Sequence, residues 1–165
     1  FAVLRMGNLQ RGEIDFSDLV FTNNSDDFKN LQLFEGDILF NRTNSPELVG
    51  KASIFRGFDQ LCIFAGYLIR VKVNQEKILP EYLNLVLNSP YGQKLNEKNV
   101  SISGNQANIN ATKLRSYLIP TPPLDIQRSI IESIEFERNL IFSNKKLMEI
   151  YTQKIQDKIN NIWGE

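Results

Sequence analysis

The sequence predicts an α+β protein, in which short strands and a few helices form one domain and a long helix follows. Residues 1–73 hold the aromatic and β-branched residues in short runs separated by turn residues. Residues 77–98 show helical signals. Residues 126–163 contain neither glycine nor proline, and apolar residues recur there at seven-residue spacing. We therefore expect a first domain over 1–120 and a boundary with the long helix over 121–165.

The first half of the chain predicts five strands. Breaks such as Gly-Asn, Arg-Gly and Asn-Asn-Ser-Asp-Asp separate them. In the last strand, alternation predicts that Tyr67, Ile69, Val71 and Val73 share one face. The expected strands are FAVLRM (1–6), IDFSDLVF (14–21), DILFN (37–41), LVGKASIFR (48–56) and CIFAGYLIRVKV (62–73).

The segment 77–98 predicts a helix with Pro80 in its first turn and a break or kink at Ser89-Pro90. Its apolar side carries Leu83, Val86 and Leu87. The polar segment 100–120 predicts a loop, a helical turn near Ala111–Leu114 and a strand ending at Pro120. Two prolines then mark a boundary, after which Asp125 is expected to cap the long helix.

The long helix, expected from Ile126 to Trp163, carries a heptad pattern. A helix of this length reaches roughly 50 Å, much of it beyond a domain of this size. Its apolar stripe therefore predicts pairing with a second helix, while the plainer alternative is that it packs across its own domain. The residues expected to pair are Ile134, Ile141, Met148, Ile155 and Ile162.

Composition excludes several classes of enzyme. The chain has no histidine, which removes Ser-His-Asp triads and histidine-ligated zinc or copper sites. The single cysteine, Cys62, lies in an apolar run, so we expect a buried thiol, no disulfide and a reducing, cytoplasmic location. No cofactor, metal or membrane partner is expected. The chain also starts on an apolar run without an initiating methionine, which predicts a piece of a longer polypeptide.

Charge gives a local signal, although 19 basic residues balance 19 acidic ones. Basic residues prevail over acidic ones between residues 38 and 72. Such a patch can bind an anion on a neutral protein, or it can be a set of solvated charges at strand edges. One short motif, Asn88-Ser89-Pro90-Tyr91, is similar at three of four positions to the Asn-Pro-Pro-Tyr motif of adenine-N6 methyltransferases. No glycine-rich loop for a methyl donor accompanies it, so a turn at a helix end is the favoured interpretation.

The stretch GDILFNRTNSPELVGKASIFRG (36–57) resembles the signature of the specificity subunit of type I restriction-modification enzymes, within its target-recognition domain. Three further stretches resemble this family in the same order: LRMGNLQRGEIDFSDLVF (4–21), LPEYLNLVLNSPYGQKL (79–95) and GNQANINATKLRSYLIPTPPLDIQRSII (104–131). The resemblance implies a target-recognition domain of short, mostly antiparallel, twisted strands, followed by a coiled-coil helix. It also implies a non-catalytic reader of double-stranded DNA. The implied partners are a methyltransferase subunit, a restriction subunit, and a second recognition domain or a second copy reached through the helix.

Within this resemblance, six residues are candidate DNA contacts. Arginine reads guanine or holds phosphate, and asparagine can pair with adenine. Lys51 and Arg56 are the better candidates for phosphate. A structural role for these motif residues is an equally favoured alternative. Members of the family read many different DNA sequences, so residues that they share are not expected to read individual bases. The candidates are Arg42, Asn44, Lys51, Arg56, Gln106 and Asn108.

Two other functions compete with DNA reading. A fragment of an active adenine-N6 methyltransferase would explain the motif at Asn88–Tyr91 and would bind S-adenosylmethionine. A coiled-coil protein-interaction module would assemble through the helix and show no affinity for DNA.

Overall fold

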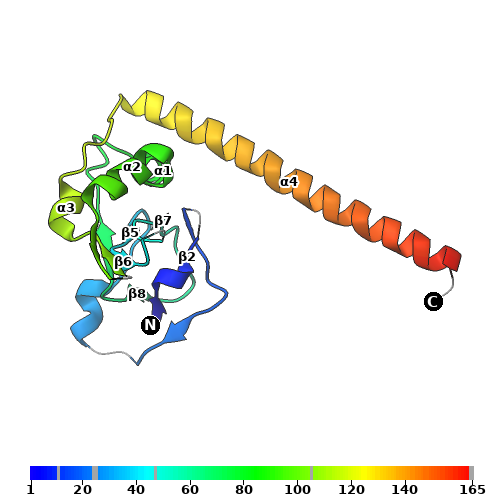
Figure 1. Cartoon of the computed structure of the whole chain (residues 1–165), viewed down its shortest axis with the longest axis horizontal. Helices are drawn as coiled ribbons and strands as arrows, with labels where there is room; N and C mark the ends of the chain where they lie inside the picture. The colour runs from blue at the N-terminus through cyan, green and yellow to red at the C-terminus, as the bar shows by residue number, and fades with distance from the viewer. Residues whose placement is uncertain (11, 24–25, 47, 105, 164–165) are drawn as a thin grey trace. The chain divides into compact units, whose positions relative to one another are not determined.

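The computed structural model describes the chain except residues 11, 24–25, 47, 105 and 164–165. It divides into two compact units, Phe1–Gln127 and Arg128–Glu165. Figure 1 traces the elements of both in chain order. Each unit is described by itself.

The centre of the first unit is strand β5 (Ile38–Asn41). It lies between β7 (Ala52–Ile54) and β9 (Leu68–Val71), antiparallel to both. All four β5 residues are buried, which explains why the run Ile-Leu-Phe-Asn shows no alternation of apolar and polar residues.

The two faces of β5 contribute to two separate clusters of buried residues. Ile38 and Phe40 belong to the first cluster and Leu39 belongs to the second, because successive side chains of a strand point to opposite faces. The first cluster also contains Val49, Ala52, Ile54, Leu83, Leu87, Ala107, Ile109 and Tyr117. The second contains Ala2, Leu4, Leu9, Leu33, Phe55, Cys62 and Leu68.

Three smaller sheets complete the first unit. In one, β1 (Ala2–Leu4) lies between β4 (Val20–Phe21), antiparallel, and β8 (Cys62–Phe64), parallel. The others are the pair β2 (Leu9–Gln10) and β3 (Glu13–Ile14), and the sheet β10 (Ser101–Ser103), β11 (Gln106–Asn108) and β6 (Thr43–Asn44). Two 3₁₀ turns, η1 (Met6–Asn8) and η2 (Asp26–Leu31), link strands. Most pairings between described strands are antiparallel, so the predicted α+β class with short, mostly antiparallel strands is confirmed.

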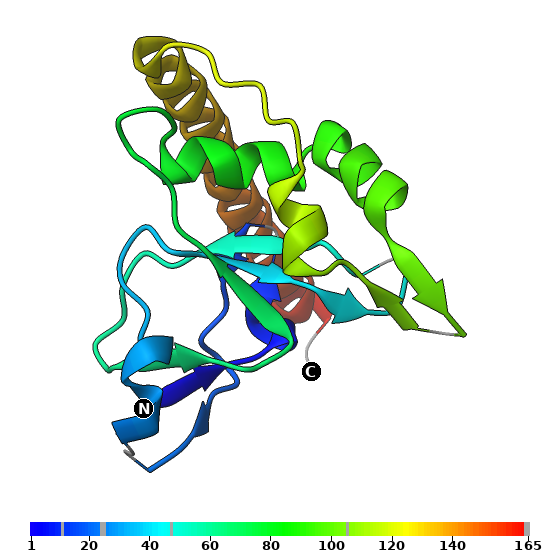
Figure 2. The same ribbon diagram turned by 90° about the vertical axis from the view of Figure 1, so that its left-hand side faces the viewer.

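The predicted helical segment forms two helices, α1 (Pro80–Asn88) and α2 (Pro90–Asn99). Pro80 and Pro90 each occupy a first helical position, and the Ser89 side chain accepts a hydrogen bond from Gly92 N–H, so the predicted break at Ser89-Pro90 is confirmed. Helix α1 (green) contacts β7 and covers one side of the central sheet (cyan) in Figure 2. Leu83 and Leu87 are buried there, and Val86 is half-buried.

Between residues 100 and 120 one expectation is confirmed and two are wrong. Helix α3 (Ala111–Arg115) is the predicted helical turn. The predicted loop before it contains the antiparallel strands β10 and β11, and the predicted strand ending at Pro120 is absent from the described residues 116–120. Two tyrosines hold that last stretch instead: Tyr91 Oη donates to the Leu118 carbonyl at 2.7 Å, and Tyr82 Oη to the Pro120 carbonyl at 3.1 Å. Hydrogen bonds from tyrosine side chains thus hold this stretch in place of a strand pairing, in which proline has no backbone N–H to donate.

Two local expectations also need correction. Ile69, Val71 and Val73 share one face, as predicted, and this face packs against the first cluster, but Tyr67 precedes β9 and is exposed. Asp125 does not precede the long helix, because α4 begins at Leu124 and Asp125 lies within its first turn. A carboxylate in that turn is still favoured by the helix dipole.

Helix α4 (Leu124–Trp163) is 40 residues long, close to the predicted span. Its first turn belongs to the first unit, where Gln127 is fully buried. The Gln127 amide accepts from Leu79 N–H at 2.8 Å and donates to the carbonyls of Lys77 and Pro122 at 2.9 and 2.7 Å. This explains the glutamine in the Pro-Pro-Leu-x-x-Gln sequence.

In the second unit, the predicted stripe of α4 is open to solvent. Ile134 is half-buried, and Ile141, Met148, Ile155 and Ile162 are exposed. No helix of the described chain is long and apolar enough to cross a membrane.

Candidate nucleic-acid interface

The candidate residues follow β5, and the turn before this strand is structural. Gly36 has a positive φ of 88°, which glycine adopts without strain. Asp37 is buried, and its carboxylate accepts from Phe34 N–H at 3.0 Å, with the Arg70 guanidinium 3.9 Å away. The Gly-Asp pair of the signature therefore fixes the start of β5.

The end of β5 is fixed by Asn41. This residue is fully buried, its N–H donates to the Lys51 carbonyl, and its carbonyl accepts from Gly50 N–H, both at 2.8 Å. The segment between residues 41 and 51 is thus closed at its base by two backbone bonds. Its polar side chains start from a rigid point.

Arg42 lies between β5 and β6 and is half-buried. Its N–H donates to the Tyr67 carbonyl at 3.2 Å, and its carbonyl accepts from Ile109 N–H at 2.9 Å. Its Nε is buried and has no hydrogen-bond partner among the described residues. The backbone of Arg42 is therefore held on two sides, while part of its guanidinium has no partner within the described chain.

Strands β6 and β11 bring the two predicted polar segments together. Thr43 pairs with Asn108 and Asn44 with Ala107 in an antiparallel register. The Asn108 amide donates to Thr43 Oγ1 at 2.6 Å across the strands. The structure thus brings Arg42 and Asn44 together with Gln106 and Asn108, although more than 60 positions of the sequence separate the first pair from the second.

A hollow of about 450 Å³ opens beside this pairing, and we call it the β6–β11 hollow. Gln106 is exposed at it, and its amide has no hydrogen-bond partner among the described residues. The Asn44 amide is already engaged: its oxygen accepts from Ser45 N–H at 2.8 Å, and its nitrogen lies 3.3 Å from Met6 Sδ. The lining residues are Met6, Thr43, Asn44, Ser45, Tyr67, Ser103 and Gln106.

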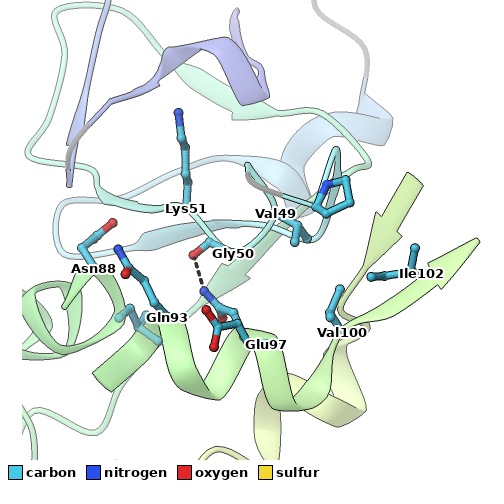
Figure 3. Close-up of a pocket in the computed structure, with 11 residues that line it drawn as sticks. Val49, Gly50, Lys51, Asn88, Gln93, Glu97, Val100 and Ile102 are labelled. Carbon is cyan, nitrogen blue, oxygen red and sulfur yellow. Dashed lines mark hydrogen bonds between the residues drawn. The ribbon is translucent and has the colours of Figure 1, made fainter. Parts of the chain in front are cut away.

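Lys51 lies at a different place, in a cavity of about 580 Å³ beside α2 (Figure 3). In that view the Lys51 side chain points away from Glu97, which lies on α2 at the opposite side of the cavity. The floor is fixed by Asn96, whose amide donates to the Gly50 carbonyl at 3.4 Å. Its lining residues are Pro46, Val49, Gly50, Lys51, Leu87, Asn88, Gln93, Asn96, Glu97, Val100 and Ile102.

Arg56 is exposed and forms an ion pair with Glu13, with Nε 3.1 Å from a carboxylate oxygen. Neither Arg56 nor Lys51 lines the β6–β11 hollow. A phosphate at Arg56 would have to compete with the Glu13 carboxylate. Exposed pairs of this kind contribute about 0–1 kcal/mol, so that competition is feasible.

The motif Asn88-Ser89-Pro90-Tyr91 is used structurally. The Asn88 amide donates to the carbonyls of Ala52 and Asn84 at 3.0 and 2.8 Å. Ser89 caps α2, and the Tyr91 hydroxyl donates to the Leu118 carbonyl. These groups hold helices α1 and α2 in place, as the turn interpretation predicted.

Cys62 is buried, and burial raises the pKa of its thiol above the ordinary value. A neutral buried thiol is a poor nucleophile, which agrees with the structural role predicted for it. No cluster of metal-ligating side chains occurs among the described residues.

Comparison with known proteins decides the family. The sequence pattern of the family described as type I restriction modification DNA specificity domain matches residues 5–158. The chain belongs to this family. The resemblance inferred from the signature stretch and its companions is therefore confirmed.

Relatives of this specificity domain carry corresponding names. The chain is 29% identical over 152 residues to the putative type I restriction enzyme MjaX specificity subunit of Methanocaldococcus jannaschii, covering 91% of this chain and 36% of that protein. It is 26% identical over 163 residues to the type I restriction enzyme EcoKI specificity subunit of Escherichia coli, covering 97% of this chain and 34% of that protein. The chain thus spans about a third of the length of these relatives.

The fold is shared with a solved specificity subunit. The crystal structure of the HsdS subunit from Thermoanaerobacter tengcongensis superposes with a TM-score of 0.62 at 16% identity, covering 89% of this chain and 38% of that one. Identity at this level supports the fold alone.

Of the residues that line the β6–β11 hollow, only Asn44 and Gln106 were among the predicted site residues, and Met6, Tyr67 and Ser103 also lie outside the signature stretch. Met6 and Ser103 lie in segments that were interpreted only as strand and loop, and Tyr67 was expected to share one face of its strand with Ile69, Val71 and Val73. The sole signal for Met6 was its place in the segment that resembles the family. For Tyr67 and Ser103 the sequence offered none.

Proposed function

We propose that this chain is a sequence-specific module for reading double-stranded DNA in a type I restriction-modification specificity subunit. In this role it performs no chemistry and directs methyltransferase and endonuclease subunits to their site. The observation that carries the proposal is the pairing of β6 with β11 in a chain of this family. This pairing gathers amide side chains and Arg42 on a backbone fixed by buried bonds, and base reading requires such a rigid platform.

The candidate residues divide by chemistry. Arg42, half-buried at the end of β5, suits guanine or a phosphate. Gln106 suits a base edge at the hollow. Asn44 lines the same hollow with its amide bound to Met6 and Ser45, and Asn108 supports Thr43 from the neighbouring strand. Lys51 and Arg56 lie outside the hollow and suit phosphates, so removing either should lower the slope of log affinity against log salt by about 0.9.

The long helix supplies the second half of the proposed role. Its apolar stripe from Ile141 to Ile162 is exposed, and the relatives that the chain matches are about three times as long, which leaves room in them for a second helix and a second recognition domain. We propose that α4 pairs with such a helix, or with a second copy of this chain. Two recognition domains on one duplex would gain affinity from each other. This exposed stripe also sustains the competing proposal of a protein-interaction module without DNA affinity.

The test is a selection from random duplex DNA at low salt, with the mass of the protein in solution measured in parallel. Enrichment of a short motif is expected, duplicated at a fixed gap if the protein is a dimer. A folded dimer that enriches no sequence would refute the DNA-reading proposal for this chain and favour the interaction module. Because this role requires access to DNA, we propose a cytoplasmic location.

A further inference from the structure

The β6–β11 hollow differs in charge from the surfaces on which phosphates are expected. Seven described residues line it, and none of these seven is charged. A phosphate in this hollow would find no countercharge on its lining. The hollow offers amide, hydroxyl and thioether groups instead, which can contact the donors, acceptors and methyl group of base edges.

Three of its polar groups are free to bind a ligand. The Gln106 amide, the Tyr67 hydroxyl and the Ser103 hydroxyl have no hydrogen-bond partner within the described chain. By contrast, both ends of the Asn44 amide are engaged, and Thr43 Oγ1 accepts from Asn108. Gln106 is therefore the amide at the hollow that can turn both its donor and its acceptor to a ligand.

Met6 provides an apolar wall on a well-fixed turn. It begins η1, where Arg5 N–H donates to Asn8 Oδ1 at 2.8 Å. The buried Asn8 amide donates in turn to the carbonyls of Asp15 and Asp18, both at 2.9 Å. The Asn44 amide nitrogen also contacts Met6 Sδ, so the turn that carries Met6 and its thioether are both held at the hollow.

The free Gln106 amide and the Met6 thioether match the groups of one base pair best. Adenine presents an acceptor and a donor in the major groove, N7 and the N6 amine, which match the donor and acceptor of an amide. Guanine presents two acceptors there, so one of them would face the amide oxygen and be repelled. The paired thymine carries a methyl group, for which a thioether is a suitable apolar contact.

We infer that the β6–β11 hollow reads an A·T base pair in the major groove, with Gln106 as the specificity-determining residue for adenine and Met6 against the thymine methyl. This inference rests on the proposed DNA-reading function. It adds to it a reader residue, a base pair and two participants, Met6 and Tyr67, from outside the family signature. Tyr67 supplies a further hydroxyl for the same base pair or its neighbour.

The experiment compares the unchanged protein with Gln106→Leu and Gln106→Glu in the same DNA selection, followed by binding titrations. Gln106→Leu should lose about tenfold discrimination for adenine at one position and keep its preferences elsewhere. Its salt dependence should not change, because no phosphate contact is removed. Gln106→Glu keeps only acceptors and should move the preference at that position towards cytosine, whose N4 amine donates.

Gln60→Leu is the matched control, because Gln60 is also exposed but lines neither cavity. A second arm replaces the thymine opposite the selected adenine by deoxyuridine, which lacks the methyl group. That change should weaken binding by the unchanged protein several-fold and leave a Met6→Ala variant unaffected. Both arms use variants whose thermal unfolding matches that of the unchanged protein.

The outcomes separate the two proposals. If the unchanged protein selects no motif, the DNA-reading function itself fails. If it selects a motif and Gln106→Leu and Gln106→Glu select the same motif with equal strength, the function stands and the inference is overturned. A uniform loss across all positions, with a shallower salt slope, would also overturn it, because Gln106 would then be a phosphate contact.

Discussion

The two units of this chain differ in how far their apolar side chains are exposed. In the first unit, Ile38, Leu39 and Phe40 of β5 are each 0% exposed and contribute to two separate clusters. In the second, Ile141, Met148 and Ile162 of α4 are 56%, 70% and 74% exposed. Apolar side chains of similar size are thus enclosed in one unit and open to water in the other.

This contrast identifies the unit that buries its apolar residues with side chains of its own. Burying a side chain such as isoleucine or methionine stabilises a protein by about 1.5–3 kcal/mol, and the first unit gains this from its own residues. The stripe on α4 can gain it only when something covers it. We therefore expect substitutions in the first unit to change its folding and substitutions on the α4 stripe to change association.

The largest effect is expected at Gly50. A Cβ there would clash with the buried Asn96 side chain, and the φ of Gly50 is +88°, so alanine meets both a clash and a strained backbone. We expect Gly50→Ala to lower the free energy of unfolding by about 4 kcal/mol, from overpacking together with the positive φ. Urea denaturation measures the loss.

Gly57→Ala is the matched control for this prediction. Its φ is +96°, but an added Cβ would meet nothing within 4 Å. Gly57→Ala should lower the free energy of unfolding by only about 1–2 kcal/mol, because only the positive φ is strained. Equal losses in the two variants would show that the contact between the 41–51 segment and α2 does not constrain the first unit.

The second prediction concerns the exposed stripe of α4. Met148→Glu places a carboxylate on the stripe, and we expect it to weaken self-association about 100-fold, since burying an unpaired charge is costly. Sedimentation equilibrium over a concentration series measures the dimer constant. The unfolding of the first unit should stay the same.

Ser143→Glu adds the same charge on the opposite side of the helix and should leave association within about twofold. Equal weakening by both variants would mean that net charge, rather than the stripe, governs association. If the unchanged protein stays monomeric at every concentration, self-pairing is refuted, and a helix of another chain becomes the expected cover.

The sequence predicted best those elements whose signals are local. Helix α4 contains neither glycine nor proline and carries heptads. The break at Ser89-Pro90 is specified by two adjacent residues, and β5 is a short apolar run after Gly-Asp. Each of these depends on residues within a few positions of one another. The strand pair β10 and β11 was missed because Ile102 faces solvent and the segment shows little apolar content.

The candidate interface was predicted as residues but not as a surface. Asn44 and Gln106 were singled out for their chemistry, yet nothing local specifies that Thr43 pairs with Asn108, which depends on a register between distant strands. The ion pair of Arg56 with Glu13 joins residues 43 positions apart, and it too could not be foreseen. Long-range pairing therefore decides which polar residues share a surface.

The smallest predicted effect tests the closed interior of the first unit at Tyr117. Its hydroxyl donates to Asn96 Oδ1 at 2.8 Å, and burial raises the pKa of Tyr117 from near 10 to about 12. Tyr117→Phe should cost about 1 kcal/mol at pH 7, the net value of a hydrogen bond. Because the tyrosine of the unfolded chain ionises at a lower pH than the buried one, the stability of the unchanged protein falls as pH rises from about 10 to about 12. The difference in stability between this protein and the variant therefore shrinks over that range.

Denaturation midpoints of both proteins across this range isolate the effect, since other groups titrate equally in each. A difference between the two proteins that stays constant with pH would show that Tyr117 is as open to water as the α4 stripe.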